Sequence, residues 1–140
     1  MIVDLDTGVC LARAPRTAAA FADRLRGMIG RRFSDRLDAM VFPRCNAVHT
    51  CFMREPIDLL FLDRGDIALR IDAAVPPWRL CRRARGAATV VEFPAGRLAE
   101  TGVQTGHRVQ LNRISAADEV AKARSGGILI GAILQEPEQP

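Results

Sequence analysis

The sequence predicts a mainly β protein: a β-sandwich of jelly-roll character or a small barrel, mostly antiparallel, with one packed amphipathic α-helix near the N-terminus and a short C-terminal helix. Short apolar runs follow one another from residue 39 to residue 93, and proline or glycine separates them. A single helical pattern precedes these runs, whereas a parallel α/β sheet would need a helix between successive strands. Many short strands after one helix therefore favour a sandwich or a barrel.

The N-terminal region begins with a predicted hairpin. Residues 2–5 and 9–13 have β-type side chains and flank Asp6-Thr7-Gly8, which is a typical turn sequence. Pro15 suits the first turn of a helix, and apolar residues then recur at three- and four-residue intervals as far as Ile29. We therefore expect one amphipathic helix over residues 15–29 that lies on a sheet.

Strands dominate the middle of the chain. We expect them over residues 39–42, 47–53, 57–62, 67–75, 88–93 and 108–111. A brief helical turn is expected over residues 95–101, and a capping-box sequence at residues 115–118 predicts a helix that ends near residue 124. Two regions result: a β-domain over residues 1–112, and a helical extension with a disordered tail over residues 113–140.

Size and composition indicate one globular domain. The chain has 140 residues, of which 49% are hydrophobic, and this suffices for a core without metal or disulfide support. No apolar run approaches the roughly 18 residues that span a bilayer, and the acidic N-terminus is unlike a signal peptide. We therefore expect a cytoplasmic protein without a membrane partner, whose four cysteines are reduced thiols.

The net charge of +4 does not by itself indicate nucleic-acid binding. The basic residues are almost all arginines spread along the chain, and residues 79–85 form the only dense run. The chain has no tyrosine, and Trp78 is the lone aromatic residue beside that run, so a base-stacking platform is missing. We interpret the run as a solvated loop and expect no nucleic-acid partner.

Residues 49–63 are the most informative segment, because ionisable side chains stand there among apolar ones. In a straight strand Cys45, His49 and Cys51 would share one face and form a conceivable soft-metal site. At the usual strand rise the two thiols would lie about 20 Å apart and could not hold one ion. We therefore predict no metal and no cofactor, with the cysteines acting as small hydrophobes.

Asp58 lies within the apolar run 57–62, where an unpaired carboxylate would be costly to bury. In the structural interpretation, it accepts backbone N–H groups or pairs with an arginine such as Arg54 or Arg26. In the functional interpretation, His49, Thr50 and Arg54 line a pocket beside it and present donors to a small anionic ligand or a peptide carboxylate.

Glu92 is a further candidate at this pocket. It precedes Phe93-Pro94 near a strand end, and we interpret it as a turn anchor rather than a general acid. Known catalytic signatures such as a nucleophile elbow, a P-loop or a zinc-protease motif are absent from the sequence. We therefore expect a small non-catalytic binding or accessory domain, whose partner is an anionic ligand or a protein.

An enzyme is the alternative. A small hydrolase, or a metal or thiol enzyme, would use His49, Cys51 and Asp58. On one face of a strand His49 and Cys51 would lie about 7 Å apart, beyond hydrogen-bond reach. Pairing of Cys51 with His107 across the fold stays open, and so does the oligomeric state.

Several motifs in order resemble the DUF192 (UPF0127) family, in the subgroup whose central motif reads His-Thr-x-Phe-Met-Arg. They are residues 24–30 (RLRGMIG), 40–42 (MVF), 45–54 (CNAVHTCFMR), 56–58 (PID), 77–79 (PWR) and 92–96 (EFPAG). The resemblance covers about three quarters of the chain, from residue 7 to residue 111. Two positions depart from the family pattern: His107 stands where Asp is usual, and Ala39 where Gly is frequent.

The resemblance implies a compact, mostly antiparallel β-domain with one packed helix. It implies no activity, because the family has none assigned. Relatives are thought to occur near pilus-assembly genes in some bacteria, which implies an accessory role in pilus assembly or secretion.

Overall fold

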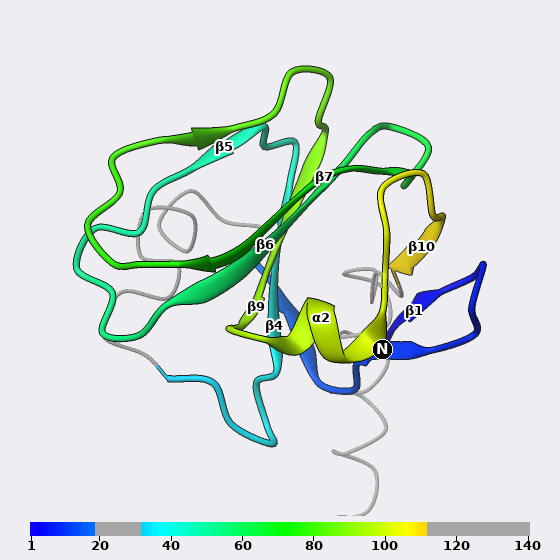
Figure 1. Ribbon diagram of the computed structural model, residues 1–140, viewed down its shortest axis with the longest axis horizontal. Coiled ribbons are helices and arrows are strands. Elements are labelled where there is room, and N and C mark those ends of the chain that lie inside the picture. The colour runs from blue at the N-terminus through cyan, green and yellow to red at the C-terminus, as the bar shows by residue number, and fades with distance from the viewer. Residues whose placement is uncertain (19–31, 112–140) are drawn as a thin grey trace, which may run out of the picture.

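The computed structural model describes residues 1–18 and 32–111, and within these segments the chain forms three sheets (Figure 1). The central sheet has five strands in the order β3-β4-β9-β6-β7; a second sheet has the order β10-β1-β2, and β5 pairs with β8. The strands are β1 (Ile2–Asp4), β2 (Cys10–Ala12), β3 (Pro15–Thr17), β4 (Ala39–Pro43), β5 (Ala47–Val48), β6 (Ile57–Leu62), β7 (Ala68–Val75), β8 (Arg82–Arg83), β9 (Thr89–Pro94) and β10 (Val109–Leu111).

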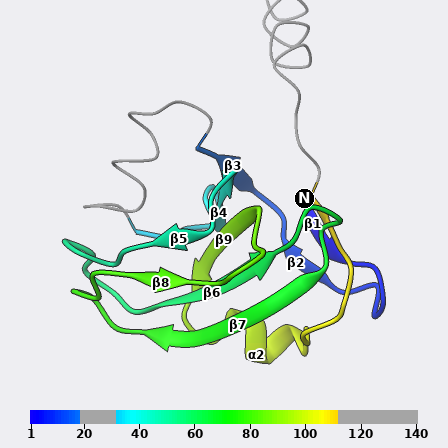
Figure 2. The same cartoon turned by 90° about the horizontal axis from the view of Figure 1, so that it is seen from above.

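The prediction of a mainly β, mostly antiparallel fold is confirmed, but the described segments do not close into a barrel. The exception to the antiparallel pattern is β3, which runs parallel to β4 with Pro15 opposite Ala39. The predicted hairpin at the N-terminus is present as β1 and β2, although a register shift interrupts its pairing. Figure 2 shows the β5–β8 pair and the central sheet one above the other, with α2 (Arg97–Thr101) at the opposite side.

The predicted start of the N-terminal helix is wrong. Pro15, expected in a first helical turn, opens β3 at the edge of the central sheet. A proline lacks the backbone N–H, so an edge strand tolerates it, and its fixed φ is also compatible with extended backbone. The rest of the predicted helix, residues 19–29, lies outside the described residues.

The central strands are buried because side chains cover both faces of the sheet. All six residues of β6 are buried, as are the first five of β9, and this explains their continuous apolar sequence. One face belongs to a cluster around Leu60 and Phe93, and the other to a cluster around Leu59 and Phe61. We refer to these as the first and the second cluster.

The strand predicted over residues 47–53 is too long. β5 ends at Val48, and the chain then turns through a loop instead of continuing to Met53. The pairing that β5 does have is with β8, where Val48 lies opposite Arg82. Sequence reasoning did not predict β8, because two arginines in a charged run do not form a strand pattern by themselves.

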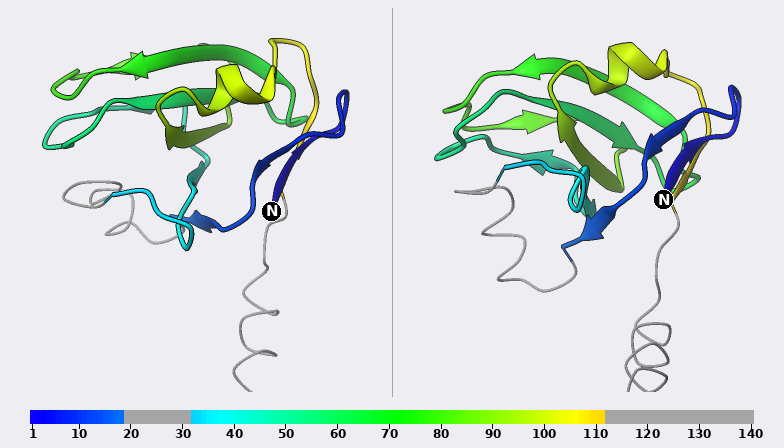
Figure 3. Two further views of the ribbon diagram at one scale, coloured as in Figure 1. Left: turned by 60° about the horizontal axis from the view of Figure 1, so that its bottom comes forward. Right: turned by 90° about the horizontal axis from the view of Figure 1, so that it is seen from below.

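The C-terminal part of the described chain follows the prediction. α2 ends at Gly102, whose φ of 70° is the left-handed conformation that a helix C-cap favours. It packs against β2, β7 and β9, and Figure 3 shows it beside the central sheet in both views. β10 then pairs with β1 and closes the small sheet. The predicted helix over residues 115–124 lies outside the described residues, and no helix among the described ones is long and apolar enough to cross a membrane.

Candidate functional site

Thr50 joins two loops at one end of the molecule. Its side-chain hydroxyl donates to the carbonyl of Pro76 at 2.7 Å and accepts from the N–H of Arg79 at 2.9 Å. Its own N–H donates to the Arg79 carbonyl, and its carbonyl accepts from the N–H of Trp78, each at 2.9 Å. Thr50 is fully buried, so these bonds hold the loop 49–56 against the loop 76–81.

We call these four hydrogen bonds of Thr50 the Thr50 clasp. The loops that it joins expose an apolar tip to solvent. Phe52 and Trp78 stack edge to face with ring centroids 4.7 Å apart, and each is 61% exposed. Leu80, two residues after Trp78 in the same loop, is 85% exposed. Phe52 and Trp78 have φ angles of 62° and 67°, a left-handed backbone that costs about 1 kcal/mol or more for a bulky residue. We refer to Phe52, Trp78 and Leu80 as the apolar tip.

His49 and Arg54 stand at the two ends of the same loop. Both are exposed, and neither has an ion-pair partner among the described residues. The hydroxyl of Thr50 between them is already bonded to backbone groups. Of these three residues, therefore, His49 and Arg54 are the ones with side-chain donors unused within the described residues. A ligand role for these residues stays a prediction.

Asp58 is a fully buried structural carboxylate. One carboxylate oxygen accepts the N–H of Ala74 in β7 at 2.8 Å, and the other accepts the N–H of Leu98 in α2 at 2.9 Å. The expected acceptance of backbone N–H groups is confirmed. Asp58 ties α2 to the edge strand β7 of the central sheet, and it satisfies one of the first N–H donors of a helix that has no side-chain cap.

Glu92 lies on the opposite face of the sheet from Asp58. It stands opposite Met40 on one side and Leu59 on the other, facing the second cluster. Its side chain is buried, and its Oε2 atom has no hydrogen-bond partner among the described residues. Burial raises the pKa of Glu92 to about 8. Asp58 and Glu92 therefore do not line one pocket, and the predicted turn anchor is wrong because no turn amide contacts Glu92.

The predicted thiol arrangement also changes. Because β5 ends at Val48, Cys45, His49 and Cys51 do not share the face of one strand. The Cys45 thiol donates to the carbonyl of Ala47 at 3.0 Å, and no hydrogen bond joins His49 to Cys51. Within residues 1–18 and 32–111 no three metal-ligating side chains stand together.

His107, which stands where the family usually has Asp, contacts a carboxylate in the structure. Its Nδ1 atom lies 2.7 Å from Oδ2 of Asp4, which is fully buried in β1. Burial alone would raise the pKa of Asp4, but hydrogen bonds from His107, from Thr7 and from the backbone of Asp6 outweigh it, so that pKa is lowered. The pair joins β1 to the loop before β10, and His107 is thus engaged far along the sheet from Cys51.

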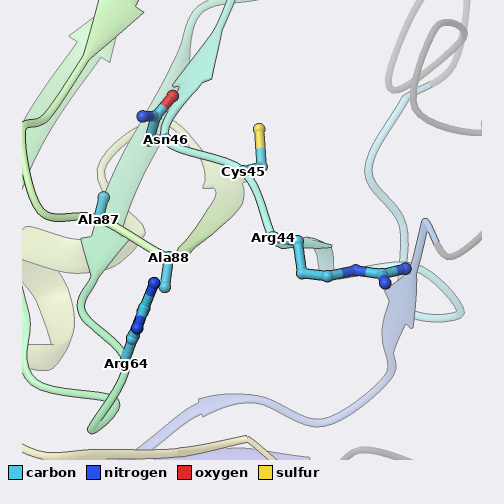
Figure 4. Close-up of a pocket in the computed structure, with 6 residues that line it drawn as sticks. All are labelled: Arg44, Cys45, Asn46, Arg64, Ala87 and Ala88. Carbon is cyan, nitrogen blue, oxygen red and sulfur yellow. The ribbon is translucent and has the colours of Figure 1, made fainter.

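A cleft of about 430 Å³ opens where three segments meet at one end of the central sheet (Figure 4). Arg44, Cys45 and Asn46 follow β4, Arg64 follows β6, and Ala87 and Ala88 precede β9. Backbone bonds hold the segments together: the Cys45 N–H donates to the Ala88 carbonyl at 3.1 Å, and the Ala88 N–H donates to the Leu62 carbonyl at 2.7 Å. We call these six lining residues the cationic cleft.

No carboxylate lines the cationic cleft, and neither Arg44 nor Arg64 forms an ion pair within the described segments. Figure 4 shows Arg64 extending toward Ala88, while Arg44 extends to the other side, so the two guanidinium groups do not meet. Sequence reasoning marked Cys45 and Asn46 as part of a motif but missed both arginines. Only Arg44 was adjacent to that motif; nothing in the sequence pointed to Arg64.

Comparison with known proteins settles the family. A model of the DUF192 family, described as uncharacterised, matches residues 7–111. The chain belongs to the DUF192 family. A UPF0127 protein of Pyrococcus furiosus is 32% identical over 106 residues, which cover 71% of this chain and 90% of that protein.

Two crystal structures share the fold of this DUF192 protein. One is a protein of unknown function from Novosphingobium aromaticivorans, with a TM-score of 0.62, 22% identity, and coverage of 69% of this chain and 74% of that one. The other, from Sinorhizobium meliloti, is described as a candidate transcription regulator; its TM-score is 0.62 at 24% identity, with coverage of 69% and 79%. At these identities the likeness is one of fold.

Proposed function

We propose that this DUF192 protein is a small non-catalytic binding domain whose cationic cleft holds a small polyanion. The observation that carries the proposal is that Arg44 and Arg64 both line one cleft that no carboxylate lines. A guanidinium without a protein partner is a ready donor for carboxylate or phosphate oxygens. The volume of about 430 Å³ lies in the range of small-molecule sites.

The direction of the two arginines favours a ligand with more than one acidic group. Because the guanidinium groups stand on different sides of Cys45 and Ala88, one phosphate would reach one of them, whereas a longer polyanion would reach both. Asn46 is exposed at the same cleft and adds an amide that can donate or accept. The anion site that we propose therefore lies just before the His49-to-Arg54 segment rather than within it.

The enzyme alternative has less support. Asp58 uses both carboxylate oxygens for backbone N–H groups, so it is not available to orient His49 or to activate Cys51. A thiol nucleophile needs an adjacent base, and the described residues place none beside Cys51. An accessory role in pilus assembly or secretion stays a prediction that rests on the family resemblance.

The test is calorimetric titration of the full chain with citrate and, separately, with inorganic phosphate at low ionic strength. We expect citrate to bind more tightly than phosphate, and Arg44→Gln and Arg64→Gln each to weaken citrate binding about tenfold, because each removes a charge-assisted contact. Melting curves of the ligand-free variants should match that of the unmodified chain, since both arginines are exposed.

Arg108→Gln is the matched control. Arg108 is exposed and has no ion-pair partner among the described residues, but it lies in the loop before β10 and lines no part of the cationic cleft. Citrate affinity should stay unchanged in this variant. Equal weakening in Arg108→Gln and Arg64→Gln would mean that net charge alone attracts the anion, and the proposal would then be wrong.

A further inference from the structure

The apolar tip is a second surface, separate from the cationic cleft in its residues and in its chemistry. Its three side chains come from two loops, 49–56 and 76–81, that the Thr50 clasp holds together. Figures 1 and 2 show these loops projecting side by side past the end of the sheet. A projecting end that carries a tryptophan, a phenylalanine and a leucine in water is an unusual surface for a soluble domain.

The backbone holds the tip in this outward position. Phe52 and Trp78 both have left-handed φ angles, while their neighbours Thr50 and Met53 are buried. The strained backbone is fixed on the inner side by the clasp and by Met53 in the second cluster. The two rings are therefore held toward solvent by the hydrogen bonds of Thr50 and the burial of Met53 beneath them.

Positive charge surrounds the tip. Arg54 and Arg79 lie in the two tip loops, are exposed, and have no ion-pair partner among the described residues. From residue 73 to residue 91 the chain contains four arginines and no carboxylate. Nearby Glu55 is paired with Arg32 at 3.4 Å. An occupant of this surface should thus be apolar at its centre and anionic around it.

We propose that the apolar tip inserts into the interfacial region of a bilayer that contains anionic lipids, with Arg54 and Arg79 against the headgroups. Three features favour a lipid surface over a protein: the tip projects instead of forming a groove, tryptophan prefers the membrane interface, and the unpaired charges around it are cationic. The sequence prediction of no membrane partner came from the absence of a spanning segment. A surface contact by loop tips needs no such segment.

Trp78 makes the test direct, because it is the single tryptophan of the chain. The full-length protein is mixed with phosphatidylcholine vesicles that contain phosphatidylglycerol, and with vesicles of phosphatidylcholine alone. We expect co-sedimentation and a blue shift of the tryptophan emission with the anionic vesicles, both reduced at high salt. Brominated acyl chains should quench the emission, which reports the depth of Trp78.

Two sets of variants keep Trp78 as the reporter. Leu80→Ser removes an exposed apolar side chain and should weaken partition about tenfold or more. Arg54→Gln and Arg79→Gln should each weaken it about fivefold, the factor for one lost charge near an anionic surface. Leu5→Ser is the matched control, because Leu5 is 51% exposed in the β1–β2 hairpin at a distance from the tip, and it should bind as the unmodified chain does.

Other occupants would give other results. An unchanged emission maximum with anionic vesicles overturns the proposal. Sedimentation without a blue shift or bromine quenching also overturns it, since charge alone would then hold the protein. A blue shift with single-stranded oligonucleotide and none with vesicles would assign the tip to nucleic acid. Because no cleft residue is changed, failure here leaves the proposed anion site unaffected.

Discussion

Asp58 and Glu92 are buried carboxylates on neighbouring strands, yet their hydrogen bonding differs. Asp58 lies opposite Phe93, and Glu92 lies opposite Leu59, so one residue of offset turns the two side chains to different faces of the sheet. On the first face Asp58 accepts two backbone N–H groups. On the second face Glu92 lies among apolar side chains, and its Oε2 atom has no hydrogen-bond partner in the described part of the chain.

The difference shows that burial alone does not define the role of a carboxylate. Asp58 is next to a bulge in β7 pairing and to the start of α2, where the backbone has N–H groups without other partners. Glu92 faces strands whose N–H groups are already paired in the ladders. Burial disfavours the charged form of Glu92 and raises its pKa to about 8, so Glu92 stays protonated and neutral at pH 7.

The largest effect is expected from Glu92→Gln. Between pH 4.5 and about 8 the unfolded chain loses the Glu92 proton while the folded chain keeps it, so the stability of the unmodified protein should fall as pH rises. The shift corresponds to a loss of up to about 5 kcal/mol by pH 9. Urea unfolding should show that Glu92→Gln lacks this loss and is the more stable protein at pH 9.

Glu100→Gln serves as the control, because the Glu100 side chain is 70% exposed. It should retain the pH dependence of the unmodified chain. If Glu92→Gln and the unmodified chain have parallel stability curves, Glu92 has a partner in solution and the contrast with Asp58 disappears.

A smaller loss is expected from Asp58→Asn. The amide group keeps the shape but replaces one acceptor oxygen with an NH2 donor. One of the two backbone N–H groups therefore loses its acceptor, and the other donates to a neutral oxygen instead of a charged one. We expect a cost of about 3 kcal/mol in the free energy of unfolding. Asp63 is the comparison, since it also accepts two backbone N–H groups but in a partly exposed turn.

Asp63→Asn should cost about 1 kcal/mol. Equal costs at the two positions would show that burial adds nothing to the role of Asp58. Loss of protection of the Ala74 and Leu98 amides in hydrogen exchange would locate the effect at the predicted contacts.

The smallest effect concerns Asp72, which lies opposite Leu59 on the same face as Glu92 but near the sheet edge. Arg70 and Arg82 approach its two oxygens at 2.7 and 2.9 Å. Arg82→Gln should cost about 1 kcal/mol, because its guanidinium is partly exposed and Arg70 remains. Arg83→Gln, which breaks no ion pair within the described segments, should change stability by less than about 0.5 kcal/mol.

Thermal or urea unfolding of Arg82→Gln and Arg83→Gln measures the two stability costs. Equal, near-zero costs would support the sequence interpretation of residues 79–85 as an undifferentiated solvated run. A clear difference would show that β8 is anchored to β7 through Asp72.

Sequence reasoning was sufficient for the family, the mainly β class and the positions of most strands, because short apolar runs bounded by proline or glycine indicate buried strands from local sequence alone. It also determined that Asp58 needs partners. The tertiary structure alone decided that Pro15 starts an edge strand, that β5 stops at Val48, and that Arg44 and Arg64 share a cleft. Those outcomes depend on register and on contacts between segments far apart in the chain, and local propensity carries no information about either.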